Sequence, residues 1–212
     1  MTATLLSIHP ENPQQRLIKQ AVEVLHDGGV IVYPTDSAYA LGCHIGDKAA
    51  MERIRRIRNL ESKHDFTLVC RDLSEIALYA KVGKADYRLM KSLTPGPYTF
   101  ILKATREVPR RLQNPKRRTI GLRVPDHPIA SLILETLGEP VMSSTLILPG
   151  DELPMVDPED MFERLKHQVD LVIDGGFCGI EPTTVVDLVE DEPVVVRQGK
   201  GDISQFIEMP HH

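Results

Sequence analysis

The amino-acid sequence predicts an α/β domain built on a twisted, mixed sheet with flanking helices. Short apolar runs rich in β-branched residues alternate along the chain with segments whose apolar residues recur at helical spacing. The C-terminal part is richer in strands, and residues 184–188 and 193–197 are expected to form a hairpin. Interleaved helices favour parallel pairing and the hairpin adds antiparallel pairing, so the expected sheet contains both.

Six helices are expected from their apolar spacing and end signals. The first follows Asn12-Pro13, interpreted as an N-cap and first helical residue, and ends at Asp27-Gly28-Gly29. Asp47 is expected to cap the second, whose apolar stripe includes Ile54 and Ile57. The other four are expected over residues 73–80, 85–93, 127–137 and 158–167.

Besides the hairpin, strands are expected over residues 30–33, 66–70, 98–103, 119–124, 141–144 and 170–173. Pro34 ends the first of these, and Thr35, Asp36 and Ser37 then present two hydroxyls and a carboxylate in succession. This segment is either an ordinary loop or the mouth of a pocket. Pro95-Gly96-Pro97 is a rigid turn that either approaches a ligand closely or only joins two elements.

The composition is that of a single globular domain spanning residues 1–212. No apolar run approaches a membrane span and the N-terminus lacks a signal pattern, so a cytoplasmic protein without membrane contact is expected. The three cysteines are an odd number without a CxxC pair, which argues against a disulfide framework. The scattered histidines form no zinc-type cluster, so we expect no dedicated metal site.

The motifs of several enzyme classes are absent. The chain has no GxxxxGK[ST] loop, no GxGxxG after a strand and no GxSxG nucleophile elbow. The net charge is −5, yet residues 106–123 hold seven Arg or Lys and one Glu. A basic stretch in an acidic protein indicates either a local anion site or a solvated loop.

Three arginine side chains are candidates for binding anions. If the chain is extended at Arg56 and Arg58, both guanidinium groups point to one side and suit a polyphosphate. The alternative is a solvated basic helix face. Arg123 leaves a strand beside Pro125-Asp126-His127-Pro128, where it either meets a carboxylate or phosphate or lies at the surface.

Seven segments, in this order, resemble the pattern of the YrdC/YciO family of threonylcarbamoyl-AMP synthases and their relatives, and most of all its YciO branch. They are Tyr33-Pro34-Thr35-Asp36 followed by Tyr39 and Leu41-Gly42, Arg56-Ile57-Arg58, Pro95-Gly96-Pro97-Tyr98-Thr99, Leu122-Arg123-Val124-Pro125-Asp126-His127-Pro128, Ser143-Ser144-Thr145, Pro182-Thr183-Thr184-Val185-Val186-Asp187 and Val196-Arg197-Gln198-Gly199. Each piece alone is weak, but the ordered set is specific and covers nearly the whole chain.

The resemblance implies a twisted mixed sheet around a large, concave, positively charged cavity. It also implies a nucleotidyltransferase that joins L-threonine, bicarbonate or CO2, and ATP into threonylcarbamoyl-AMP, releasing pyrophosphate. That product serves the N6-threonylcarbamoyladenosine modification of tRNA. Mg²⁺ is expected to arrive with ATP, because this ion is usually held by substrate phosphates.

The resemblance also implies roles for particular residues. Arg56, Arg58 and Arg197 are candidates for phosphate contacts, and Thr35, Arg123 and Ser143 for holding threonine or carboxylate groups. No catalytic side chain is assigned, because in-line transfer requires mainly positioning and charge neutralisation.

The alternative function is a double-stranded RNA or tRNA-binding module that keeps the fold without efficient catalysis. The candidate RNA contacts are Arg110, Arg111, Lys116, Arg117 and Arg118. A scaffold that binds no ligand would give no reason for the hydroxyl and Arg residues at strand ends.

Two departures from the family pattern predict a weak or altered activity. Arg56 stands where the family has Lys, and a planar guanidinium does not replace a compact ammonium without effect. Thr145-Leu146-Ile147 stands where the family has Ser-Ala-Asn, and the Ile147 side chain can neither donate nor accept a hydrogen bond.

Overall fold

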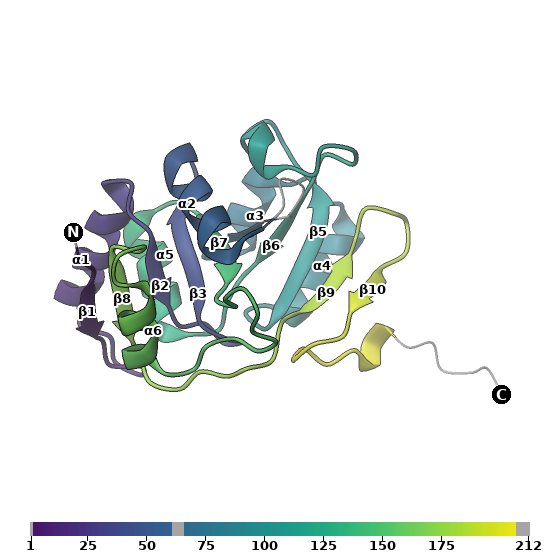
Figure 1. Ribbon diagram of the computed structural model, residues 1–212. Coiled ribbons are helices and arrows are strands. Elements are labelled where there is room, and N and C mark those ends of the chain that lie inside the picture. Colours follow the sequence, from purple (N-terminus) through teal and green to yellow (C-terminus); the bar gives the residue numbers. More distant parts are fainter. Residues whose placement is uncertain (1, 61–65, 207–212) are drawn as a thin grey trace.

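A computed structural model describes residues 2–60 and 66–206 and joins ten strands into one sheet (Figure 1). The strand order is β1-β8-β2-β3-β7-β4-β6-β5-β9-β10. The strands are β1 (Thr4–Ser7), β2 (Ile31–Tyr33), β3 (Ala40–His44), β4 (Thr67–Val69), β5 (Tyr98–Lys103), β6 (Thr119–Arg123), β7 (Val141–Thr145), β8 (Leu171–Asp174), β9 (Thr184–Asp187) and β10 (Val194–Arg197).

The predicted mixed sheet is confirmed. Parallel pairs join β1 to β8, β8 to β2, β4 to β6 and β5 to β9, and the remaining neighbours are antiparallel. The predicted C-terminal hairpin is β9 and β10. The predicted single domain over residues 1–212 stays a prediction, and residues 1, 61–65 and 207–212 lie outside the described part of the chain.

Six α-helices flank the sheet within the described residues. They are α1 (Gln15–His26), α2 (Lys48–Arg58), α3 (Leu73–Tyr79), α4 (Lys84–Leu93), α5 (Pro128–Leu137) and α6 (Pro158–Leu165). Two short 3-10 helices are η1 (Arg110–Leu112) and η2 (Ser204–Phe206). None of the described helices is long and apolar enough to cross a membrane.

Most helix ends follow the predicted signals. The Asp47 carboxylate accepts the N–H of Ala50 at 2.8 Å, and Gly138 ends α5 at a φ of 73°. The start predicted at Asn12-Pro13 is wrong, since Gln14 is the N-cap of α1. His9 Nδ1 accepts the N–H of Asn12 at 2.9 Å, which holds this segment in a turn before the helix.

Helices cover both faces of the sheet because successive strand residues point to opposite sides. Ile31 and Tyr33 of β2 belong to a buried cluster with side chains of α1 and α5. Val30 and Val32 belong to the larger cluster, which includes side chains of α2, α3, α4 and α6. The α/β alternation in the sequence thus produces a layered domain.

One row of the sheet carries small or hydroxyl-bearing side chains and leaves space above it. The register places Gly121 beside Ile101 and Thr67, and Thr67 beside Ser143. On the opposite face the adjacent row is Phe100, Leu122, Leu68 and Met142, each fully buried. The sheet therefore has a packed side and a hollow side in this region.

Two neighbouring residues of β5 test this division. Leu102 is 1% exposed in the core, whereas Ile101 is partly exposed toward the hollow side. We expect Leu102→Ala to lower the free energy of unfolding by about 2–5 kcal/mol, because it leaves a cavity in a packed layer. Ile101→Ala should lower it by roughly 1 kcal/mol. Urea denaturation measures both, and equal losses would contradict the assignment of the two faces.

Candidate functional site

A cavity of about 500 Å³ lies on the hollow side of the sheet. Its lining comes from β3, β4, β5, β6, β7 and β9 together with the end of α2 and the loop after β2. The charged residues among its described lining are Arg58, Arg117, Arg123, Arg197 and Glu152. This volume falls within the range of roughly 300–1,000 Å³ that small-molecule sites occupy.

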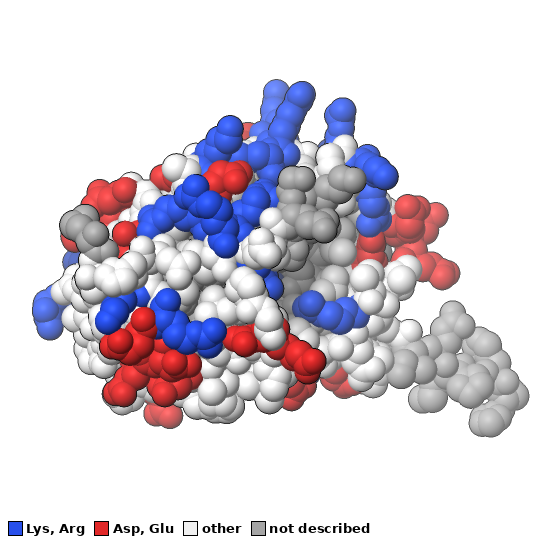
Figure 2. All heavy atoms as spheres, viewed as in Figure 1, with Lys and Arg blue, Asp and Glu red and all other residues white. Residues whose placement is uncertain are grey.

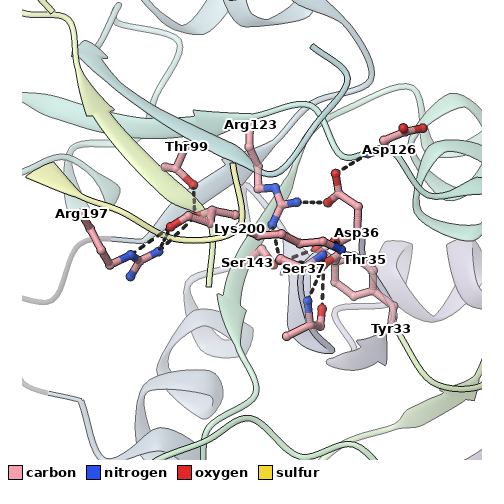
Figure 3. A network of polar contacts seen from close by, with 12 residues as sticks. Tyr33, Thr35, Asp36, Ser37, Thr99, Arg123, Asp126, Ser143, Arg197 and Lys200 are labelled. Atoms are coloured by element: carbon pink, nitrogen blue, oxygen red, sulfur yellow. Dashed lines mark hydrogen bonds and ion pairs between the residues drawn. The ribbon is translucent and has the colours of Figure 1, made fainter. Parts of the chain in front are cut away.

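One lining residue of the cavity, Arg123, forms an ion pair with Asp36 (Figure 3). The Arg123 guanidinium at the end of β6 donates to the Asp36 carboxylate and, at 3.0 Å, to the Ser37 hydroxyl. The second oxygen of Asp36 accepts the N–H of Asp126 at 2.8 Å, and Lys200 donates to the main-chain oxygen of Asp36. Arg123 is only 7% exposed, so its charge is largely removed from water and relies on this pairing.

One nitrogen of the Arg123 guanidinium has no hydrogen-bond partner among the described residues. Among the described residues, its Nε is the buried side-chain nitrogen or oxygen without a hydrogen-bond partner. A buried donor left unsatisfied costs about 1–3 kcal/mol. The buried position of Arg123 beside the cavity therefore lowers the stability of the fold.

The Thr35 hydroxyl holds the loop after β2 in its shape. It donates to the carbonyl of Ala38 at 2.6 Å and accepts the N–H groups of Ser37 and Ala38. Thr35 lines the cavity as expected, but most of its hydrogen-bonding capacity is used by the turn. Ser37, which was not among the predicted site residues, presents its hydroxyl beside Arg123 instead.

Ser143 lies in a chain of hydroxyls on the cavity wall. Its Oγ donates to the carbonyl of Leu41 at 3.1 Å and lies 2.7 Å from the Tyr33 hydroxyl, which can then donate to it. Burial raises the pKa of Tyr33 to about 12, so this hydroxyl stays protonated at neutral pH. The structure places Ser143, Thr35 and Arg123 in the lining of one cavity, and that they bind substrate stays a prediction.

Arg58 and Arg197 line the same cavity from different elements. Arg58 donates to the Ser144 hydroxyl at 2.6 Å and to the main-chain oxygen of Ile147 at 3.1 Å. Two nitrogens of the Arg197 guanidinium donate to the main-chain oxygen of Thr183, and one of them also donates to the Thr183 hydroxyl. Burial lowers the pKa of both guanidinium groups. Each arginine is thus anchored by part of its planar group, while its remaining terminal nitrogen makes no hydrogen bond to the described residues.

The expected convergence of Arg56 and Arg58 is wrong. Helix α2 continues to Arg58, and residues two apart in a helix point in different directions, not the same one. Arg56 is exposed and is not among the residues that line the cavity. Asn59, at a φ of 53°, ends the helix one residue after Arg58.

The predicted RNA contacts divide between two places. Arg110, Lys116, Arg117 and Arg118 line a separate pocket, whereas Arg111 donates to the carbonyl of Ile45. Arg117 also lines the cavity and pairs with Asp187 at 2.8 Å. Binding of RNA by these residues stays a prediction.

Other segments singled out in the sequence also have defined places. Thr145 and Ile147 line the cavity, while Leu146 is fully buried in the core. Gly96 and its two flanking prolines line a different recess, next to Asp36 and His127. The His127 ring accepts the N–H of Ile129 as the N-cap of α5, and burial lowers its pKa.

The sequence matches the family model described as "Telomere recombination", that of Sua5, YciO and YrdC, over residues 23–199. It is 62% identical over 200 residues to the YciO protein of Escherichia coli K12, which covers 94% of this chain and 97% of that protein. The crystal structure of E. coli YciO matches with a TM-score of 0.93 at 61% identity, covering 97% of this chain and all of that one.

More distant proteins carry functional names. The threonylcarbamoyl-AMP synthase of Nitrosococcus oceani is 34% identical over 129 residues, which is 60% of this chain and 69% of that enzyme. The structure of P. abyssi Sua5 complexed with L-threonine matches with a TM-score of 0.85 at 24% identity, over 93% of this chain and 58% of that one. At that identity the match supports the fold alone. By the family match and the E. coli relative together, the chain belongs to the Sua5/YciO/YrdC family, which includes threonylcarbamoyl-AMP synthases.

Proposed function

We propose that the cavity binds L-threonine, bicarbonate and ATP and forms threonylcarbamoyl-AMP, with a turnover lower than that of the family's synthases. The observation that carries the proposal is the gathering of three guanidinium groups, Arg58, Arg123 and Arg197, in one cavity that the Ser37 and Ser143 hydroxyls also line. Carboxylate and phosphate oxygens are the acceptors that guanidinium groups bind with charge-assisted hydrogen bonds. Family membership supplies the choice of substrate.

The Arg123 end of the cavity suits threonine. The carboxylate would accept from Arg123, and the substrate hydroxyl could exchange hydrogen bonds with Ser37 or Ser143. The other arginines suit the phosphates of ATP. Arg58 and Arg197 are held by protein contacts and still have guanidinium N–H groups to offer, so little orientation is lost when they bind.

The chemistry needs no nucleophilic side chain. The threonine nitrogen and bicarbonate give a carbamate and water, and a carbamate oxygen then attacks the α-phosphorus of ATP. The new P–O bond forms as the bond to the β-phosphate breaks, so pyrophosphate leaves with the electron pair. Holding the reactants in line and neutralising charge supply the acceleration.

Mg²⁺ bound with ATP is part of the proposal. In the described part of the chain no three His, Cys, Asp or Glu side chains gather as a metal site, and Glu152 is the acidic residue that lines the cavity. These residues fit an ion held mainly by phosphate oxygens and water, with Glu152 as a protein carboxylate within the same cavity. When bound, the ion would neutralise charge on the departing pyrophosphate.

Pyrophosphate release tests the proposal directly. Protein given ATP, bicarbonate and Mg²⁺ should release pyrophosphate only when L-threonine is added, and mass spectrometry should detect threonylcarbamoyl-AMP. Serine is the control for the substrate methyl group. If no threonine-dependent release occurs at high protein concentration and the protein binds double-stranded RNA in a separate assay, the alternative RNA-binding module is favoured.

The two arginines of α2 provide a matched pair for phosphate binding. Arg58→Ala should reduce turnover by about 10²–10³-fold, because it removes a fixed cation from the reacting phosphates. Arg56→Ala changes the same charge two residues away and should stay within about threefold of the parent. Melting temperatures control for the contacts of Arg58 to Ser144 and Ile147. Equal effects of the two changes would contradict the placement.

Ile147→Asn should increase activity. Ile147 lines the cavity and is partly exposed, so the polar side chain is tolerated and can add one hydrogen bond to a ligand. A net gain of about 0.5–1.5 kcal/mol corresponds to roughly 2- to 12-fold in kcat/KM for ATP. Ile147→Val is the control that changes volume alone. A loss of activity in the Asn variant would show that this position does not explain the altered rate.

A further inference from the structure

The connection between β5 and β6 carries a second pocket that the proposed reaction does not use. It has a volume of about 660 Å³, larger than the cavity, and we call it the basic pocket. Seven Lys or Arg side chains line it, and all seven are exposed: Lys81, Lys103, Arg106, Arg110, Lys116, Arg117 and Arg118. Figure 2 shows such side chains gathered along the upper rim, above α2 and the β5–β6 connection.

Little of this positive charge is neutralised by the described residues. No Asp or Glu is among the described residues that line the pocket. Arg117 pairs with Asp187, whereas no ion pair with an acidic residue of the described chain is formed by Lys81, Arg110 or Lys116. Gathering like charges is unfavourable, and a protein with a net charge of −5 does not need them for solubility.

The pocket is built by an ordered turn. The Asn114 side-chain oxygen accepts the N–H groups of Lys116 and Arg117, and the Lys103 ammonium donates to the carbonyl of Arg117 at 2.7 Å. Arg118 adopts a φ of 55°, a conformation that costs a residue with a side chain about 1 kcal/mol or more. The turn therefore holds these cations together in spite of an unfavourable backbone conformation at Arg118.

We propose that the basic pocket is a second anion site, which binds a compact ligand carrying two or more linked phosphates. Guanidinium groups match phosphate oxygens with two parallel hydrogen bonds, and seven cations exceed what a single carboxylate or phosphate can use. A pocket of about 660 Å³ can take up a compact anion, whereas a nucleic-acid duplex is too wide to enter it and would touch only its rim. The site adjoins the cavity, because Asn114 and Arg117 line both, but it does not depend on the proposed reaction.

Calorimetric titration with inorganic tripolyphosphate tests the site. The triple variant Lys81→Gln/Arg110→Gln/Lys116→Gln removes exposed cations that make no ion pair with the described residues, and it should weaken binding by about tenfold or more. The matched control Lys84→Gln/Arg88→Gln/Lys91→Gln removes the same charge from the exposed side of α4 and should change affinity by less than about twofold.

A cavity variant separates the two anion sites. Arg58→Gln/Arg197→Gln should still bind tripolyphosphate at the basic pocket, and loss of all binding in it would overturn the proposal. Equal weakening by both triple variants would also overturn it, since that result indicates unspecific attraction. Binding of an RNA duplex without any binding of tripolyphosphate would assign the patch to nucleic acid instead.

Discussion

The buried ion pair between Arg123 and Asp36 is the interaction on which the cavity depends. β2 and β6 lie four places apart in the sheet, and the pair ties the loop after β2 to the end of β6 across the intervening strands. It also fixes Ser37 and the backbone of Asp126. Removing one partner would leave a buried charge alone, at a cost of roughly 3–5 kcal/mol. The hydroxyl-rich end of the cavity therefore keeps its shape only while this pair is intact.

Stability alone does not account for such a pair. Apolar residues of similar volume often hold two segments together as well as buried charges do. Arg123 also keeps a buried N–H without an acceptor in the described chain, which lowers the stability of the fold. Both facts favour a role for Arg123 in binding. The hollow above the small side chains of Thr67, Gly121 and Ser143 gives a ligand access to it.

Local patterns in the sequence predicted most of the fold but missed two strands, β1 and β3. β3 is Ala-Leu-Gly-Cys-His, with no β-branched residue, because its neighbours require small side chains. A side chain at Gly42 would lie 2.8 Å from both the Tyr33 ring and Val141, and so would disturb the ring that reaches Ser143. β1 is a short, mostly exposed edge strand, which has little alternation to detect.

The site was predictable in its residue types but not in its geometry. The row of Thr67, Gly121 and Ser143 exists only through the register of three strands, which are far apart in the sequence. Arg56 and Arg58 looked equivalent by spacing. Because α2 continues to Arg58, the two side chains point in different directions, and of the two only Arg58 lines the cavity. Helix ends are set by one or two residues, here Asn59, so spacing could not decide between them.

The altered segment at Thr145-Leu146-Ile147 separates two properties that the family pattern combines. Its backbone still positions an arginine, since the carbonyl of Ile147 accepts from Arg58 whatever side chain the residue carries. Its side chain, however, brings an aliphatic surface into the cavity. In the proposed reaction, phosphate binding would depend on the first property and the orientation of the nucleotide on the second. We therefore expect the protein to bind nucleotide through its arginines. The missing polar contact should lower mainly the reaction rate.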